Sequence, residues 1–321
     1  MGAEFIHSPL VQNETVTAGT VMSYDLPVNP LSFILVTLRF QQDKANLQLD
    51  WDNVDAAIAK LEVLFRGSPI FSANGSDIEA LQCLLLGYEP AITNRLGVDN
   101  EYTFFTFLIP MTRHLYSPKE CFPRSTRGEL ILQITYQAAF SDIDNVSLQV
   151  ETVELPEATP SQYMRVTTLS VTPTAAGEMD VELPIGNRLA GVLFFGTTVP
   201  LADANVQTLQ YGQLLIDNQR RYFSQTNFET WRQLAALRHK PAIAHGSHTH
   251  QIDGSAFAQY MDTSVVKYRN DRGIQHLFWD FDPMMDGMYE LETSGSSDVV
   301  ARIYAGDINA LRVLPLEIIG A

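Results

Sequence analysis

Residues 24–40 read YDLPVNPLSFILVTLRF, and residues 181–198 read VELPIGNRLAGVLFFGTT. Each stretch contains an acidic residue followed by Leu-Pro, continues through a short polar turn and ends in an apolar run rich in aromatic and β-branched residues. Such a run, bounded by Pro, Gly or Asn, is typical of a strand. The same order of features therefore occurs twice, which predicts two copies of one structural unit.

Further matched features follow these two stretches in the same order. Residues 76–79 (SDIE) and 226–229 (TNFE) each predict a capping box, in which the first and fourth side chains bind backbone amides at a helix N-terminus. Strand-like runs that end in Pro-Met then follow at residues 104–111 and 277–284. The repeat therefore extends over most of the chain.

Each predicted helix has one apolar face. Apolar residues recur at helical spacing after each capping box, and we expect them to pack on a sheet. In the first helix these are Ile78, Leu81, Leu84 and Leu85, and in the second they are Phe228, Trp231, Leu234 and Leu237. Gly87 is expected to end the first helix.

The remaining pattern is β, and it fixes the predicted domains. Apolar and polar residues alternate over residues 130–136 and 146–151, as in strands with one buried face. We predict an all-β first domain over residues 1–156 with a helix at about 77–87. The second domain covers residues 157–321, and its helix at about 227–239 is followed by a long loop at 240–273.

Composition excludes several classes of protein. The 321 residues are 45% apolar and 18% charged, which excludes a disordered chain. With 21 Lys and Arg against 37 Asp and Glu, the net charge is −16, and Arg220-Arg221 is the only adjacent basic pair. A protein that grips nucleic acid needs a basic stripe, so we expect no direct nucleic-acid binding.

Cysteine content and the N-terminal sequence indicate an intracellular protein. Cys83 and Cys121 are too few for a disulfide framework or a thiolate zinc site, and we expect a small buried hydrophobe and a loop thiol. The opening MGAEFIHSPLVQ lacks the charged and apolar regions of a signal peptide. The longest apolar run, residues 31–38, is too short to cross a bilayer.

This layout of two consecutive all-β units, each with one flanking helix, resembles the double jelly-roll major capsid proteins of membrane-containing icosahedral bacteriophages and of the adenovirus and tectivirus type. The resemblance lies in the order of elements over nearly the whole chain, and no motif carries site residues over. It implies two tandem eight-stranded jelly rolls, a structural role without enzymatic activity, and no cofactor.

The resemblance also implies an assembly. Three chains would form a homotrimeric capsomer with a pseudo-hexagonal outline, and capsomers would form an icosahedral shell around an internal lipid membrane. Neighbouring capsomers, vertex or penton proteins and minor capsid proteins would be its partners, and it would assemble in the host cytoplasm and reside in the virion. Residues 1–15 could contact that membrane or a neighbour, or form a tail along the domain.

Two features of the second half suggest a metal instead. His248 and His250 would share one face of a strand, and His276 could be a third ligand, as in a metal-dependent enzyme of the bicupin type. The glutamate that follows His-x-His in cupins is absent, so we assign no metal site. The acidic segment 280–290 lacks the spacing of an EF-hand, because Met284 occupies the third ligand position.

A carbohydrate-binding module is the other alternative, since Trp51, Trp231 and Trp279 could stack on sugars. Aromatic residues in β proteins are more often found in cores or interfaces, and we expect that here. We find no nucleophile elbow and no glycine-rich phosphate loop in the sequence, and we assign no catalytic residue.

Overall fold

The computed structural model describes residues 4–42, 51–87, 92–93, 100–198, 207–231, 234 and 275–321. Strands dominate these ranges, and two helices, α1 (Trp51–Ala56) and α2 (Gly75–Leu86), are defined in the first half. The strands of the first half are β1 (Ile6–Thr15), β2 (Val21–Asp25), β3 (Leu31–Gln42), β4 (Ile58–Phe65), β5 (Ser68–Ala73), β6 (Ile92–Thr93), β7 (Tyr102–Pro110), β8 (Leu130–Tyr136) and β9 (Ile143–Glu154). Those of the second half are β10 (Gln162–Val166), β11 (Leu169–Val171), β12 (Gly177–Glu182), β13 (Arg188–Gly196), β14 (Leu209–Ile216), β15 (Gln219–Asn227), β16 (His276–Asp280), β17 (Leu291–Glu292), β18 (Val299–Ala305) and β19 (Leu311–Gly320).

Both halves have the same strand order. In the first half β1-β9-β3-β7 are neighbours in one sheet and β2-β8-β4-β5 in another. In the second half the corresponding orders are β10-β19-β13-β16 and β12-β18-β14-β15. When the main strands of each half are numbered along the chain, leaving out the short β6, β11 and β17, both halves read 1-8-3-6 and 2-7-4-5. Two four-stranded sheets in this order form a jelly roll, so the predicted duplication is confirmed.

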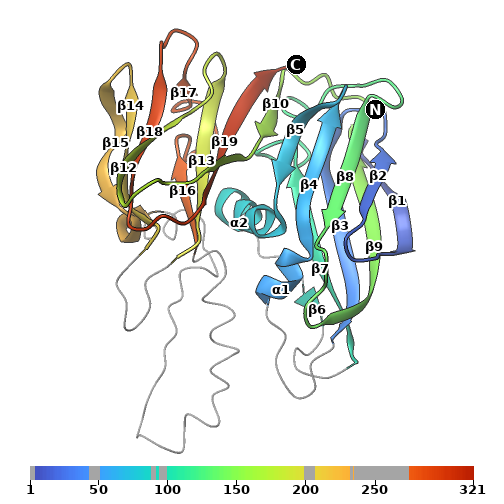
Figure 1. The fold of residues 1–321 in the computed structure, drawn as a ribbon. Coiled ribbons are helices and arrows are strands. Elements are labelled where there is room, and N and C mark those ends of the chain that lie inside the picture. The colour runs from blue at the N-terminus through green and yellow to red at the C-terminus, as the bar shows by residue number, and fades with distance from the viewer. Residues whose placement is uncertain are drawn as a thin grey trace, which may run out of the picture.

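One continuous sheet joins the two jelly rolls. Strand β10 of the second half pairs in parallel with β5 of the first through Val166 and Phe71, and antiparallel with β19 on its other side. The result is a ten-stranded sheet that includes strands of both halves (Figure 1). The chain crosses between the halves where β9 ends at Glu154 and β10 begins at Gln162. The domain boundary at residues 156 and 157 lies in this connection and stays a prediction.

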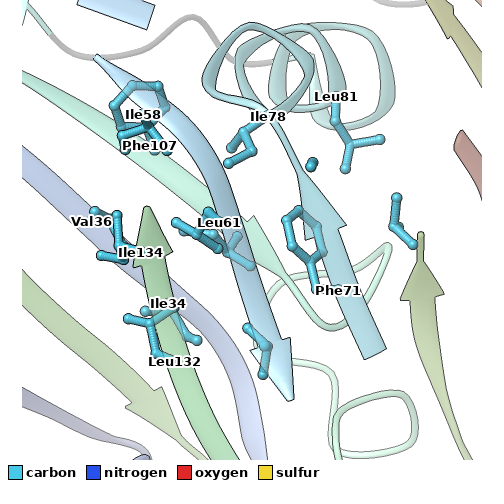
Figure 2. Close-up of a cluster of buried hydrophobic side chains, with 14 of the residues drawn as sticks. Ile34, Val36, Ile58, Leu61, Phe71, Ile78, Leu81, Phe107, Leu132 and Ile134 are labelled. Carbon is cyan, nitrogen blue, oxygen red and sulfur yellow. The ribbon is translucent and has the colours of Figure 1, made fainter. Parts of the chain in front are cut away.

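Alternation along the strands builds the core. The apolar members of the predicted pattern in β8 are buried, as are those in β9, and they lie between the two sheets of the first jelly roll. Figure 2 shows this cluster, with Ile34 and Val36 on β3 beside Leu132 and Ile134 on β8. The cluster continues into the second half through Leu314 and other residues of β13 and β19, so the contact between the jelly rolls is apolar as well.

Helix α2 lies between the two jelly rolls and is buried on every side (Figure 1). Its predicted apolar face is buried, but so are Asp77, Glu79 and Gln82, which an amphipathic helix would expose. The predicted capping box at residues 76–79 is wrong, because the helix begins at Gly75 with Asn74 as its N-cap. The predicted end is confirmed, since Gly87 adopts a left-handed φ of 71° and its amide donates to the Cys83 carbonyl.

The second helix is described only at its start. Residues 228–231 and residue 234 are helical, and the rest of the predicted helix and the loop at 240–273 lie outside the described residues. Phe228 and Trp231 are buried as predicted, whereas Leu234 is 38% exposed. Thr226 lies within β15, and the Glu229 carboxylate accepts a hydrogen bond from Gln207 at 3.4 Å.

The N-terminal residues form part of the fold. Residues 1–15 were expected to contact a membrane or a neighbour, or to form a tail along the domain. Of these, residues 6–15 form β1, which pairs with β9 from Ile6 opposite Glu154 to Thr15 opposite Ser147. Contact with a membrane or a neighbour stays a prediction. Leu10 and Val11 both pack against the core although they are consecutive, and the register of β1 shifts at this point, between Pro9 and Val11. Among the described residues, no helix is long and apolar enough to cross a membrane.

Replacing Trp231 by alanine tests the packing of the second core. The indole lies 5.3 Å from that of Trp279 between ring centroids and 6.1 Å from the ring of Phe223. Trp231→Ala should therefore leave a cavity and lower the free energy of unfolding by about 3–5 kcal/mol, measured by urea titration with circular dichroism. Ile308→Ala, at a side chain 62% exposed, should change it by less than about 0.5 kcal/mol. Equal stability of the two variants would contradict this packing.

Candidate functional site

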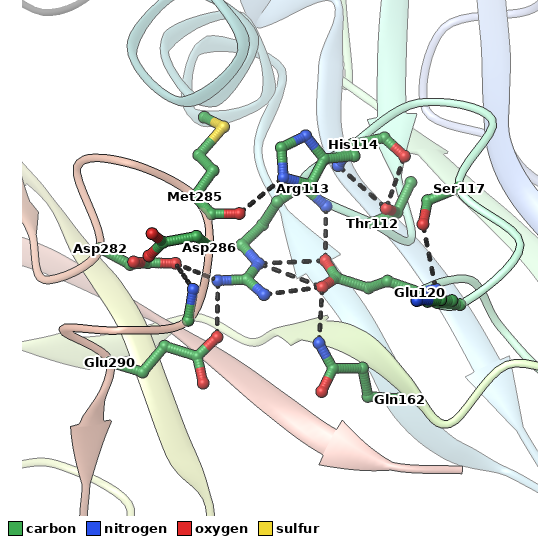
Figure 3. A network of polar contacts seen from close by, with 12 residues as sticks. Thr112, Arg113, His114, Ser117, Glu120, Gln162, Asp282, Met285, Asp286 and Glu290 are labelled. Carbon is green, nitrogen blue, oxygen red and sulfur yellow. Dashed lines mark hydrogen bonds and ion pairs between the residues drawn. The ribbon is translucent and has the colours of Figure 1, made fainter.

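Buried charged side chains gather where the two jelly rolls meet. Arg113 follows β7 in the first half, and its side chain is only 4% exposed. Its guanidinium contacts Glu120 at 2.7 Å within the first half, and Asp282 at 2.7 Å and Glu290 at 2.6 Å in the second (Figure 3). One cation therefore binds carboxylates from both jelly rolls. We call Arg113, Glu120, Gln162, Arg188, Asp282 and Glu290 the arginine cluster.

The cluster closes into a ring. Glu290 also contacts the Arg188 guanidinium at 2.6 Å, and Arg188 donates to the Gln162 side-chain carbonyl at 2.6 Å. The Gln162 amide in turn donates to Glu120 at 2.8 Å. Every side chain of this ring has a charged or polar partner, as a buried charge requires, although the buried Asp282 Oδ1 and Glu290 Oε1 atoms accept no hydrogen bond. The ring thus includes residues on β10 and β13 and in the loops after β7 and β16.

Two neighbouring contacts hold the loops of the cluster in place. His114 Nε2 lies 2.7 Å from the Met285 carbonyl oxygen, and the Gly287 amide donates to the Asp282 carboxylate at 2.8 Å (Figure 3). The turn at residues 282–290 is therefore fixed both by its own backbone and by the loop of the first half.

The pKa values of Glu120 and Glu290 shift in opposite directions. Hydrogen bonds and charge from Arg113 outweigh burial at Glu120 and lower the pKa of that carboxyl. At Glu290, burial raises the pKa, reinforced by the nearby Asp282 charge, and the two guanidinium groups do not fully compensate. Three carboxylates around two guanidinium groups leave one excess negative charge when all are ionised. Glu290 is the carboxylate whose ionised form this excess disfavours.

A second buried group joins α2 to the second half. The Asp77 carboxylate lies 3.0 Å from His276 Nε2 on β16 and accepts two hydrogen bonds of 2.7 Å from the Arg312 guanidinium on β19. Arg312 also stacks on the Phe195 ring, 3.6 Å from its centroid. Hydrogen bonds from His276 and Arg312 together outweigh burial and lower the pKa of Asp77. This contact explains why the first turn of α2 carries a buried carboxylate.

The predicted metal ligands are only partly described. His276 is buried and its Nε2 is engaged by Asp77 of the first half, while His248 and His250 lie outside the described residues. The three-histidine site therefore stays a prediction. Asp282 and Glu290 of the acidic segment 280–290 bind arginines. Among the residues with described positions, no group of three or more His, Cys, Asp or Glu side chains could hold a metal ion.

The two cysteines are free thiols in the interior. Cys83 on α2 is a small buried side chain, as predicted. Cys121 lies in a loop but is also buried, and burial together with the charge of Glu120 raises the pKa of its thiol to about 11. A thiol with so high a pKa is a poor nucleophile at neutral pH.

Two hollows of the described surface lack the side chains that usually serve as nucleophiles or metal ligands. One of about 250 Å³ lies over β3, β7 and β9, and another of about 310 Å³ lies between β1 and the segment after β2. Neither is lined by His, Cys or Lys side chains. A small hollow of about 10 Å³ lies among Phe194, Trp231 and Trp279. Two of the predicted sugar-stacking residues, Trp231 and Trp279, therefore belong to the second core.

Sequence reasoning missed the residues that join the halves. Arg113 and Glu120 are close in the chain, but Asp282 lies 169 positions from Arg113, and Arg312 lies 235 positions from Asp77. No local spacing signals such pairs.

Comparisons with known proteins give the fold. No protein-family model and no curated protein sequence matches the chain. Among solved structures, it is similar to the STIV major capsid protein, with a TM-score of 0.69 and 14% identity over 98% of this chain and 97% of that one. The major capsid protein of bacteriophage PM2 gives a TM-score of 0.64 and 10% identity over 99% and 97%. A chain of the PBCV-1 virus capsid gives 0.62 and 9% over 99% and 94%. The chain has the double jelly-roll fold of these capsid proteins.

Replacing Glu120 and Glu290 separately tests the electrostatics of the arginine cluster. Glu120→Gln should lower the free energy of unfolding by about 3–5 kcal/mol at neutral pH, because the carboxylate accepts hydrogen bonds from the Arg113 side chain, the Arg113 amide and Gln162 that a single amide oxygen cannot all accept. Since the folded-state pKa of Glu290 is raised, the stability it contributes is full below its unfolded pKa and is lost as pH rises through the folded pKa. Glu290→Gln should therefore cost clearly less at pH 7. Urea titrations of both variants measure this difference, and equal losses would contradict it.

Acid unfolding tests the Asp77 contact. Because the folded-state pKa of Asp77 is lowered, its ionised form stabilises the fold fully above the unfolded pKa of about 3.9, and this stabilisation is lost as pH falls through the folded pKa. Asp77→Asn should cost about 3–5 kcal/mol at pH 7, and its difference from the wild type should shrink below pH ~4. Asp25→Asn, at an exposed carboxylate, is the control. A difference that stays constant with pH would show that charge is not the cause.

Proposed function

We propose that this chain is the major capsid protein of a virus, and that three copies form a pseudo-hexagonal homotrimeric capsomer of an icosahedral shell. The observation that carries the proposal is the strand order 1-8-3-6 and 2-7-4-5, present twice in one chain. The same overall fold extends over 98–99% of the chain in its alignments with the capsid proteins. Those alignments leave too few residues of this chain unmatched to form a separate catalytic domain.

The physical arrangement supports a building-block role. Two jelly rolls lie side by side and share a sheet, so one chain supplies two sides of a six-sided outline. The arginine cluster and the Asp77 contact fix the angle between them. A tile of a closed shell needs such a fixed angle, because small errors accumulate over many copies. Three chains related by a threefold axis also form a closed assembly.

The proposed setting follows from the same function. Neighbouring capsomers, vertex or penton proteins and minor capsid proteins would be partners of the trimer, and the protein would assemble in the host cytoplasm and reside in the virion. A net charge of −16 argues against direct contact with nucleic acid. It is consistent with a shell separated from the genome by an internal lipid membrane, which the protein would touch from outside.

A structural role rather than catalysis is supported by the position of His276. The alternative bicupin enzyme requires this imidazole to face a metal inside the second jelly roll. It is instead directed at Asp77 on α2, in the other half of the chain. No observation favours a carbohydrate-binding module, since Trp231 and Trp279 are buried in the core.

The oligomeric state tests the proposal. Light scattering of the purified full chain should give three times the chain mass of 35.9 kDa, and negative-stain images should show particles with a six-sided outline. Trimers in solution at micromolar concentration with that outline would support a capsomer. A monomer at all accessible concentrations, or a dimer, would contradict it.

A further inference from the structure

Exposed apolar and cationic side chains lie together on one part of the second half. Tyr222 on β15 is 52% exposed, and its hydroxyl donates to the Tyr289 carbonyl at 3.1 Å. Tyr289 belongs to the turn at residues 282–290 and is 50% exposed. Met284 and Met288 of that turn are 70% and 72% exposed. Arg220 and Arg221, beside Tyr222 on β15, are exposed as well. We call these six residues the β15 surface.

The composition of this surface is that of a protein interface. Tyr, Met and Arg are enriched in interface cores, and large apolar side chains grouped on a surface mark contact sites. Two methionines at more than two-thirds exposure cost free energy in water that burial would regain. Isolated exposed apolar residues need no such explanation, but these lie within one turn and the strand bonded to it.

The turn of this surface is anchored at both ends by the arginine cluster. The turn that carries Met284, Met288 and Tyr289 begins at Asp282 and ends at Glu290, and both carboxylates bind the buried Arg113 guanidinium. A surface that is already ordered loses little entropy on binding. The buried cluster thus prepares the exposed turn for contact.

Charge indicates what the surface contacts. Among the described residues, no carboxylate lies within ion-pair distance of Arg220 or Arg221, although the chain has 37 acidic and 21 basic residues. Two adjacent unpaired arginines in so acidic a protein fit a partner that presents carboxylates. A second copy of the chain presents them at the same concentration and in the same compartment.

Strand β15 excludes one mode of contact. It is the edge of its sheet within the described part of the chain, and an open edge invites strand addition. Tyr222 and Gln225 have left-handed φ values of 54° and 51°, which interrupt the extended edge. A contact made by side chains therefore fits this edge better than a continuous shared ladder.

We propose that the β15 surface is a contact through which one copy of this chain binds a second copy, with Met284, Met288, Tyr222 and Tyr289 as apolar anchors and Arg220 and Arg221 pairing with carboxylates of that copy. The inference rests on the proposed trimer and assigns residues to one of its interfaces. In Figure 1, β14 and β15 lie at the outer margin of the second jelly roll, away from β10, where the halves meet. The turn that carries Met284, Met288 and Tyr289 contacts β15 at this margin and reaches to the junction, where Asp282 and Glu290 bind Arg113.

Surface variants of the full chain test the assignment. Met284→Ser with Met288→Ser removes two anchors, and Tyr222→Asn removes the ring while keeping a residue that tolerates a left-handed φ. Each should raise the apparent dissociation constant of the trimer at least tenfold, measured by mass photometry across a dilution series. Ile308→Ser, which removes an equally exposed apolar side chain elsewhere, should leave it unchanged. Circular dichroism confirms that the variants are folded.

Salt and cross-linking add independent measurements. Replacing Arg220 and Arg221 by Gln should weaken the trimer and reduce the dependence of its dissociation constant on salt concentration. A photo-reactive residue at position 288 should cross-link to a peptide of another copy, identified with isotope-labelled and unlabelled chains mixed before irradiation.

The outcomes separate this inference from the proposed function. A wild-type trimer that none of these variants weakens, with no cross-link between copies, overturns the assignment of the β15 surface and leaves the capsomer standing. A wild-type chain that stays monomeric overturns both. A trimer that dissociates only in the β15 surface variants supports both.

Discussion

A buried guanidinium sets the geometry of this molecule. Arg113 is removed from water at the junction of two jelly rolls, and a charge in that position requires partners on all sides. Glu120 comes from its own half, whereas Asp282 and Glu290 come from the other. A rotation of one half relative to the other would separate these charges in a low-dielectric interior. Apolar packing tolerates sliding, but this cluster does not, so it specifies a single arrangement of the halves.

The second buried ionic contact, between Asp77 and Arg312, also requires partners from both halves. It accompanies the unusual burial of α2 on every side. A helix on the outside of a sandwich would need one apolar face, but α2 is enclosed because the second half covers its outer side. Asp77 and Arg312 turn that enclosure into a directional contact. The shared sheet, the enclosed helix and the two ionic groups together make one rigid block. The proposed role in a closed shell requires such a block. The arginine cluster also anchors the exposed turn at residues 282–290 through Asp282 and Glu290.

Much of the fold could be predicted because its signals are local. The strand at residues 130–136 alternates with period two, and the repeated Leu-Pro and apolar runs report duplication. Contacts between the halves were not predictable, because they join residues far apart in the chain and leave no spacing pattern. The acidic segment shows this: Asp282 and Glu290 suggested cation ligands, and their cations proved to be arginine side chains. The N-cap was misplaced by two residues, since Asn74 and Ser76 are equally suitable as N-caps.

The order in which the shared sheet is filled has a consequence for biosynthesis. Strand β19 is translated after every other described strand, yet it lies in the interior of the sheet between β10 and β13. Until residues 311–320 have left the ribosome, β10 and β13 face each other across an empty row of hydrogen-bonding positions, while the first jelly roll already has all its strands. The second jelly roll of a growing chain therefore stays incomplete until β19 has been translated. Open strand edges invite pairing with other chains, so the second half is exposed to premature association until β19 is in place.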